Sequence, residues 1–177
     1  MGNDTCVSNT LNIRLPLAFC MENACLNWAD ICFAVESGYM MSCDAIDFAL
    51  MRLEQKFPTA EETALAGLVL ERQCAEETVV HLLQQLAKET SLEAQCAAKE
   101  KNLFLVLKWV YEHKRSYLDP LEVVEFIFDD FNFPKEMRPF VRYVPSDEIP
   151  LPSRRLNVRR LYQNWEKYLV QQSAIWR

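Results

Sequence analysis

Residues 103–111 read Leu-Phe-Leu-Val-Leu-Lys-Trp-Val-Tyr, a run whose apolar side chains would surround a helix on all sides. By periodicity alone this run is also compatible with a buried strand. Good helix-forming residues flank it, and no turn residues interrupt it. We therefore predict a long helix from Leu92 to about Ser116, which forms the centre of the domain and is covered on most of its faces.

Glycine is scarce in this chain. Of 177 residues only three are glycine, at positions 2, 38 and 67, while half of the residues are apolar and a quarter are charged. An all-β protein needs many tight turns with positive φ angles, which glycine adopts most readily. The composition is otherwise that of an ordinary globular protein. We therefore predict an all-α, bundle-like single domain that spans residues 1–177.

Capping signals place the other helices along the chain. Thr59 followed by Glu62 has the form of a capping box, and Asp119 followed by Pro120 is a strong helix start. Gly38 is suited to end a helix. The predicted helices span 17–26, 28–37, 42–57 with Ser42 as its cap, 59–90 with a break near Gln73, 92–116, 120–133 and 154–175.

Proline is concentrated in residues 139–153, at positions 139, 145, 150 and 152. Because proline fixes φ and has no N–H to donate, this segment is predicted to be a semi-rigid connector. It leads into the long C-terminal helix at residues 154–175. The apolar face of that helix is expected to carry Val158, Leu161, Tyr162, Trp165 and Leu169.

The net charge of −6 is unevenly distributed. Residues 1–100 carry fifteen acidic and six basic residues, whereas residues 101–177 carry ten acidic and thirteen basic residues. A protein with net negative charge is repelled by phosphate backbones and membrane surfaces and is attracted to basic partners. The charge therefore favours a basic protein as the partner, over nucleic acid or membrane.

The sequence contains no recognisable secretion signal and no apolar run long enough to cross a bilayer. Its seven cysteines are an odd number, with no Cys-x-x-Cys pair. That pattern is typical of buried free thiols in a reducing compartment, and Cys25 and Cys32 should share one buried helical face. We predict a cytoplasmic protein.

No residue set in the sequence satisfies the geometry of a catalytic or metal site. Cys74 and His81 are the one tempting pair of nucleophile and base, but seven residues of helix separate them by about 10 Å. His113 lies near a predicted helix end, where a cation favours the helix dipole. Three cysteines lack zinc-ligand spacing and a neighbouring histidine: Cys20, Cys25 and Cys32. We predict that the chain is not an enzyme and holds no metal or cofactor.

The predicted helix at 120–133 carries a ridge of carboxylates, which we call the acidic ridge: Glu122, Glu125, Asp129 and Asp130. A di-iron site would need Glu-x-x-His motifs, and this helix has no histidine. A solvated helix face is the ordinary interpretation, and a partner-binding surface is the functional one. The aromatic residues of the same segment are expected to anchor the core: Phe126, Phe128, Phe131 and Phe133.

The C-terminal helix offers an alternative function. Its basic residues alternate with aromatic ones, a combination that can hold nucleic acid: Arg154, Arg155, Arg159, Arg160 and Lys167, with Tyr162 and Trp165. Pairing with the acidic N-terminal region inside the fold explains these residues more simply. A regulatory or nucleic-acid-binding helical module that uses the Arg154–Lys167 helix remains the alternative.

Several motifs in the second half of the chain resemble a family of small bacterial proteins of unassigned function. They are the segments 108–111 (Lys-Trp-Val-Tyr), 118–122 (Leu-Asp-Pro-Leu-Glu), 130–134 (Asp-Phe-Asn-Phe-Pro) and 140–145 (Phe-Val-Arg-Tyr-Val-Pro). A Phe-x-[Tyr/Phe]-Pro block before a Phe-Val-Arg-Tyr block identifies that family. The resemblance covers about residues 15–145 and includes Trp28 and the Ser-Gly turn at 37–38.

Proteins of that kind resemble immunity partners of polymorphic toxins, including those of contact-dependent growth inhibition. The resemblance implies a partner, the C-terminal domain of a cognate toxin, which in one case resembles the endoribonucleases first known from uridylate-specific enzymes. It supplies no catalytic residues and implies no small-molecule substrate. The acidic ridge is the predicted contact, and the rival surface is an acidic patch of four glutamates: Glu61, Glu62, Glu76 and Glu77.

Overall fold

The computed structural model describes residues 7–54, 57–70, 76–145 and 151–177, and in these residues the chain is all-α with no strand. Its elements are α1 (Leu17–Asn23), α2 (Trp28–Glu36), α3 (Ser42–Leu53), α4 (Ala60–Gly67), η1 (Leu68–Leu70), α5 (Glu76–Glu89), α6 (Leu92–Glu112), η2 (Lys114–Ser116), α7 (Pro120–Asp130), η3 (Lys135–Phe140) and α8 (Arg154–Trp176). The η elements are short 3-10 helices. The all-α prediction is confirmed.

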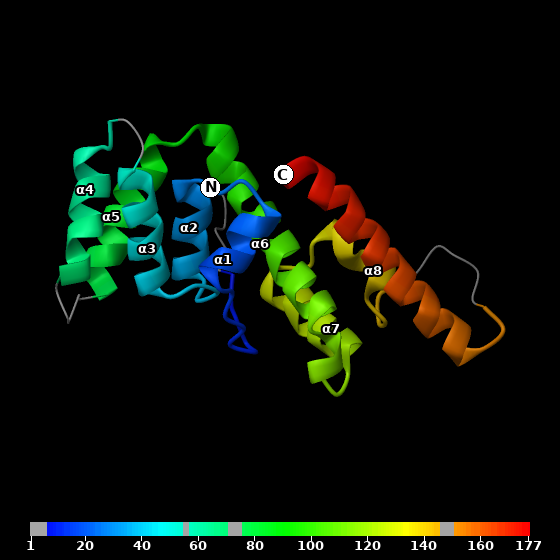
Figure 1. Ribbon diagram of the computed structural model, residues 1–177. Helices are drawn as coiled ribbons and strands as arrows, with labels where there is room; N and C mark the ends of the chain where they lie inside the picture. The colour runs from blue at the N-terminus through cyan, green and yellow to red at the C-terminus, as the bar shows by residue number, and fades with distance from the viewer. Residues whose placement is uncertain (1–6, 55–56, 71–75, 146–150) are drawn as a thin grey trace.

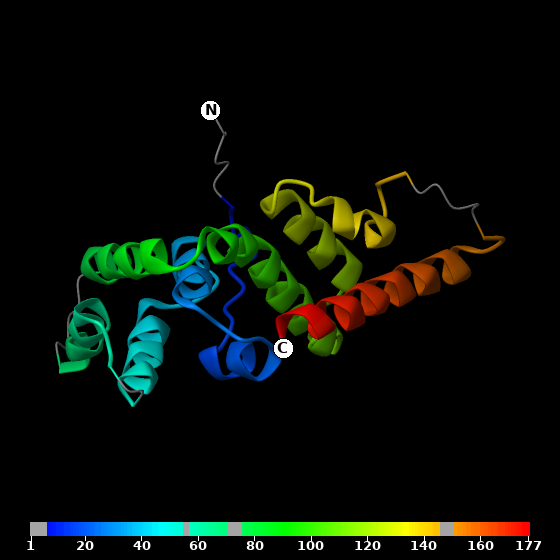
Figure 2. The ribbon, with the colours of Figure 1, turned by 90° about the horizontal axis from the view of Figure 1, so that it is seen from above.

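The helices form an elongated molecule around α6. At one end α2 packs against α5 and α6, and α3 packs against α4; at the other end α8 packs against η3 and α6 (Figure 1). The C-terminal end of α8 lies near α6, while its N-terminal end projects away from α6 (Figure 2). This arrangement leaves α7 and α8 accessible at the end opposite to α3–α5.

The central helix is where the sequence predicts it. All five side chains of residues 103–107 are buried, although they point around the whole circumference of α6. Ser91 caps its first turn by accepting a hydrogen bond from the Ala94 N–H. Burial on all sides explains why the apolar run has no helical periodicity.

Local signals give most helix boundaries correctly, with small differences. The capping box at Thr59 and Glu62 forms as predicted. The first helix ends at Asn23 rather than at 26, and Ser42 is the first residue of α3 rather than its cap. The predicted break near Gln73 lies outside the described residues.

A buried ion pair fastens three parts of the chain together. The Lys101 ammonium lies 2.6 Å from the Asp30 carboxylate and also donates to the Cys25 carbonyl oxygen. The Cys25 N–H donates to the carbonyl oxygen of Trp176, whose ring lies beneath the ammonium. Removal of one partner from such a buried pair is strongly destabilising. Lys101 therefore joins the C-terminal end of α8 to α2 and α6.

Three of the described cysteines depart from the expectation of buried thiols: Cys25, Cys43 and Cys96 are exposed. Cys20 and Cys32 are buried, and burial raises the pKa of each thiol to about 12. Cys25 is exposed, so the prediction that it shares a buried face with Cys32 is wrong. The reason is that α1 ends before Cys25 and α2 begins after it. In the part of the chain that the structure describes, no helix is long and apolar enough to cross a membrane.

Candidate functional site

The acidic ridge lies on α7, whose start is fixed by its cap. Asp119 accepts hydrogen bonds from the Leu121 and Glu122 N–H groups, and Pro120 occupies the first helical position. The opposite face of α7 is buried, through Val124 and Ile127 among others. Because this face packs on the core, three carboxylates of the acidic ridge lie on the outer side of α7: Glu122, Glu125 and Asp129.

Arg142 holds two carboxylates of this surface. Its Nε and Nη2 atoms donate to the two carboxylate oxygens of Glu125, at 2.8 and 2.9 Å, and its Nη1 atom donates to Asp119. Burial alone would raise the pKa of Asp119, but the hydrogen bond and charge of Arg142, together with the bonds from the Glu122 and Leu121 N–H groups, outweigh burial and hold the pKa below its usual range. The bidentate contact between Arg142 and Glu125 attaches residues 141–145 to α7 and neutralises part of the negative charge of the acidic ridge.

Tyr143 holds a third carboxylate. Its hydroxyl donates to Asp129, and its ring contacts Phe128 at a centroid distance of 6.0 Å. Partial burial, together with the neighbouring Asp129 carboxylate, raises the pKa of Tyr143 to about 12. The hydroxyl therefore stays protonated at neutral pH and fixes the orientation of Asp129.

Asp130 has a different role from the rest of the acidic ridge. It is only 5% exposed. Its carboxylate accepts hydrogen bonds from the Ser8 hydroxyl at 2.8 Å, from the Thr10 hydroxyl at 2.6 Å and from the Thr10 N–H at 2.9 Å. These bonds fasten the N-terminal segment to the end of α7. We therefore leave Asp130 out of the candidate contact surface.

Glu122 is the most available member of the acidic ridge. It is exposed, and its carboxylate has no partner within the residues that the structure describes. Within the described part of the chain, Glu122 and Asp129 are thus the two carboxylates of the predicted contact without a neighbouring cation. Glu125 already has one, and Asp130 is buried.

Two of the four aromatic residues expected in the core are on the surface instead. Phe128 and Phe131 are buried as predicted, whereas Phe126 is 39% and Phe133 is 58% exposed. Phe126 follows Glu122 by four residues, which places the two on the same outward face of α7. Phe133 lies beyond the end of α7, where a left-handed backbone turns the chain.

The rival acidic patch also contains a buried carboxylate. Glu62 is 5% exposed and accepts hydrogen bonds from the Trp28 indole N–H, the Thr59 N–H and Arg52. Burial would raise its pKa, but these bonds outweigh burial and lower the pKa. Glu76 and Glu77 are exposed in the first turn of α5. Glu76 and Glu77 therefore carry most of the solvent-exposed negative charge of this patch.

A family model describing an uncharacterized protein conserved in bacteria, DUF2247, matches residues 17–173. The chain belongs to this bacterial family. The match extends beyond residue 145, where the resemblance in the sequence ends, and takes in most of α8. No curated protein and no solved structure matches the chain significantly.

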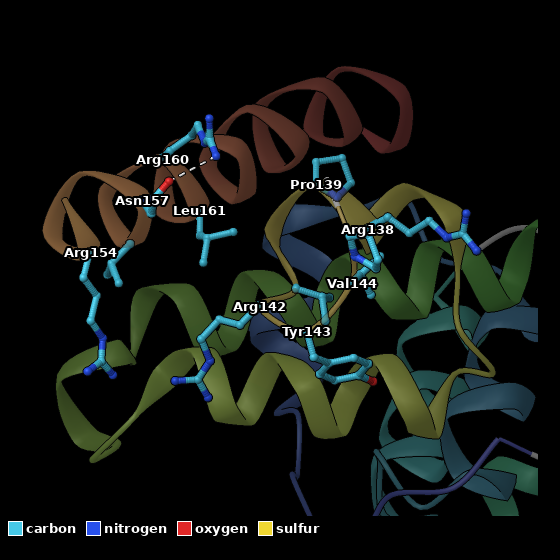
Figure 3. Close-up of a pocket in the computed structure, with 12 residues that line it drawn as sticks. Arg138, Pro139, Arg142, Tyr143, Val144, Arg154, Asn157, Arg160 and Leu161 are labelled. Atoms are coloured by element: carbon cyan, nitrogen blue, oxygen red, sulfur yellow. Dashed lines mark hydrogen bonds between the residues drawn. The ribbon is translucent and has the colours of Figure 1, made fainter. Parts of the chain in front are cut away.

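In this DUF2247 chain a groove of about 450 Å³ separates residues 138–145 from the first half of α8. Its walls are mainly apolar, and four arginines surround it: Arg138, Arg142, Arg154 and Arg160. The guanidinium groups do not converge: Arg138 points away, Arg160 folds back onto Asn157, and Arg142 is held by α7 (Figure 3). Arg138, Arg142 and Arg160 therefore do not form a common phosphate site in this groove.

The two histidines of the DUF2247 chain lie at different helices. His81 is exposed on α5. His113 lies at the end of α6, where Nδ1 is 2.8 Å from the Trp109 carbonyl oxygen and the two rings contact each other. Cys74 lies outside the described residues. Among those described, no three metal-ligating side chains come together.

Proposed function

We propose that this chain is an immunity protein that binds and neutralises a cognate bacterial toxin, a nuclease and by preference a ribonuclease. It acts by covering the active site of the toxin or the surface that holds RNA. The observation that carries the proposal is the outward face of α7, where Glu122 and Asp129 remain without a cationic partner among the described residues. Membership of a bacterial family is compatible with this role.

Charge supports a nuclease as the partner. An enzyme that holds polyanionic RNA needs a basic surface, whereas this chain has a net charge of −6. Opposite charges accelerate association by one to three orders of magnitude at low salt. An immunity protein needs such rapid association because it must bind the toxin before the toxin turns over many substrates.

The arrangement of the described side chains favours binding over catalysis. The candidate surface is formed by carboxylates that are exposed or held by Arg142 and Tyr143. The Tyr143 hydroxyl lies beside Asp129, but its pKa is raised to about 12, so it keeps its proton at neutral pH and is a poor nucleophile. We therefore propose a protein-binding role without an enzymatic step.

Co-expression tests this proposal. The chain is produced together with the C-terminal domain encoded by the adjacent toxin-like gene, and colony survival and RNA integrity are measured. Survival with intact RNA supports the proposal. Cell death despite an abundant, folded chain contradicts it, and a gel shift with RNA at physiological salt would then favour the nucleic-acid-binding alternative on α8.

A further inference from the structure

We propose that α7 presents a mixed acidic and aromatic surface that binds a basic, apolar-bearing segment of a partner protein. We call this surface the α7 stripe and define it by five residues: Glu122, Phe126, Asp129, Phe133 and Tyr143. Phe133 is its central anchor. The identity of the partner as a toxin rests on the proposed function, but the chemistry of the stripe does not.

The stripe is a continuous face. Glu122, Phe126 and Asp129 follow one another at intervals of four and three residues, which place their side chains on one side of α7. Phe133 lies beyond the end of the helix and is placed beside this face by its ring contact with Phe128. Tyr143 joins this face through its hydrogen bond to Asp129, and its ring lies against α7 (Figure 3). Acidic and aromatic side chains therefore alternate along the surface.

The aromatic members are unusually exposed. Phe126, Phe133 and Tyr143 are 39%, 58% and 54% exposed, respectively. Single exposed apolar residues are common on protein surfaces, but a group of large ones marks an interaction site. Aromatic residues also dominate the binding energy of protein interfaces.

The backbone turns Phe133 outward at an energetic cost. Asn132 and Phe133 have φ angles of 61° and 58°, a left-handed conformation that asparagine tolerates and phenylalanine disfavours. The Phe133 N–H donates to the Phe128 carbonyl oxygen and the Asn132 N–H to that of Asp129, which closes α7 with a Schellman motif. Strained residues of this kind cluster at functional sites.

The anchor is held in place despite its exposure. The Phe133 ring packs edge-on against Phe128 at a centroid distance of 5.3 Å, and Phe128 also contacts Tyr143. Arg142 fixes the neighbouring segment by its bonds to Glu125. A pre-organised surface loses little conformational freedom on binding, so more of its contact energy appears as affinity.

Charge selects the occupant. Glu122 and Asp129 alternate with aromatic faces, and this arrangement suits arginine or lysine, which pair with carboxylates and stack on aromatic rings. A second copy of this chain would place the same carboxylates against each other, because a two-fold interface is self-complementary. Nucleic acids and anionic membranes would be repelled. A basic protein segment with apolar side chains is the occupant that remains.

A defined peptide tests the chemistry without the toxin. The probe is a short synthetic peptide of repeated Arg-Leu-Gly units, titrated into the ¹⁵N-labelled chain while NMR chemical shifts are recorded. The control peptides replace every arginine with glutamate, or every leucine with serine. We expect shifts concentrated on the stripe, weaker binding by the serine peptide and none by the glutamate peptide. Shifts spread over all acidic surfaces, or equal binding by the serine peptide, would overturn the proposal.

Phe133→Asn is the decisive variant, because asparagine accepts the left-handed backbone and keeps both Schellman hydrogen bonds. We expect it to retain the thermal transition of the parent chain and to bind the arginine–leucine peptide about tenfold more weakly. The matched control is Phe57→Asn, which changes another exposed phenylalanine with positive φ. Unchanged affinity in Phe133→Asn, an equal loss in Phe57→Asn, or self-association of the parent chain that Phe133→Asn abolishes would overturn the proposal.

The toxin domain then separates the two proposals. If Phe133→Asn binds the peptide weakly and the parent chain fails to protect cells, the stripe stands and the immunity function fails. If the parent chain protects cells and Phe133→Asn binds the toxin domain as tightly as the parent, the immunity function stands and the stripe fails. Tenfold weaker binding of the toxin domain by the variant supports both.

Discussion

The α7 surface and the acidic patch of α4 and α5 look alike in sequence and differ in structure. Each has four carboxylates in the sequence, and each devotes one of them, Asp130 or Glu62, to buried hydrogen bonds. On α7 the remaining carboxylates lie among exposed aromatic rings, and two of them, Glu125 and Asp129, are ordered by Arg142 and Tyr143. The other patch consists mainly of exposed charge at the start of α5.

This comparison teaches that a count of charges does not define a binding surface. Exposed charges mainly set the rate of association and its dependence on salt. Affinity needs desolvated contacts that stay in place, and these come mostly from ordered aromatic side chains. The α7 surface offers both kinds of residue, so we expect the two regions to respond differently to the same substitutions.

Reversal of charge should give the largest difference. The double variant Glu122→Lys with Asp129→Lys is expected to slow association with the toxin domain by one to two orders of magnitude at low salt. Stopped-flow kinetics over a range of salt concentrations measures this effect. The matched control, Glu76→Lys with Glu77→Lys, should change the rate only slightly. An equal loss in both double variants would show that net charge alone steers binding.

The buried carboxylates should affect stability instead. Asp130→Ala removes the acceptor of three hydrogen bonds to Ser8 and Thr10, and we expect it to lower the free energy of unfolding by about 2 kcal/mol. Glu62→Ala should have a similar effect. Urea denaturation measures both, with exposed Glu122→Ala as the control at less than about 0.5 kcal/mol. A stability of Asp130→Ala equal to that of the parent would return Asp130 to the candidate surface.

Arg142 should contribute less to the free energy of unfolding than the buried carboxylates do, because its side chain is partly exposed. We expect Arg142→Met to lower the free energy of unfolding by about 1 kcal/mol or less. Its main effect should be faster amide hydrogen exchange in residues 141–145, which lose their attachment to α7. Arg155→Met is the control on exposed α8. If the exchange in 141–145 is unchanged, the guanidinium does not order this segment.

Lowering the pH should break the contact between Arg142 and Asp119. The pKa of Asp119 is lowered, so its bond to Arg142 stabilises the fold at pH values above the unfolded pKa and is lost as the pH falls through the folded pKa. The change should therefore occur below about pH 4. The Arg142 Nη1–H signal in NMR reports it, because Nη1 donates to Asp119, and Arg142→Met removes the signal. A transition near neutral pH would contradict this assignment.

The smallest effect is expected at the histidines. Because the sequence predicts no catalytic role for either imidazole, we expect His81→Gln and His113→Gln to leave protection in the co-expression assay unchanged. Far-UV circular dichroism confirms that each variant is folded. Loss of protection by a folded variant would reopen the question of catalysis.

The sequence predicts the helices well because their signals are local. The capping box at Thr59, the Asp119-Pro120 start and the apolar run at 103–107 each depend on neighbouring residues. The roles of Asp130 and Glu62 depend on partners 122 and 34 residues away, which no local pattern identifies.

The outward direction of Phe133 likewise follows from a left-handed backbone after α7. The sequence held one weak indication that the four carboxylates of the ridge differ. Adjacent helical residues point about 100° apart, so Asp129 and Asp130 point in different directions from α7.

Hydrogen exchange on the complex with the toxin domain tests the central claim most directly. Our account predicts that binding slows amide exchange in the last turn of α7 and in residues 131–133 and 141–145, while exchange in α5 keeps its rate. Slower exchange in α5 with no change in α7 would contradict the account and assign the contact to the patch of Glu76 and Glu77.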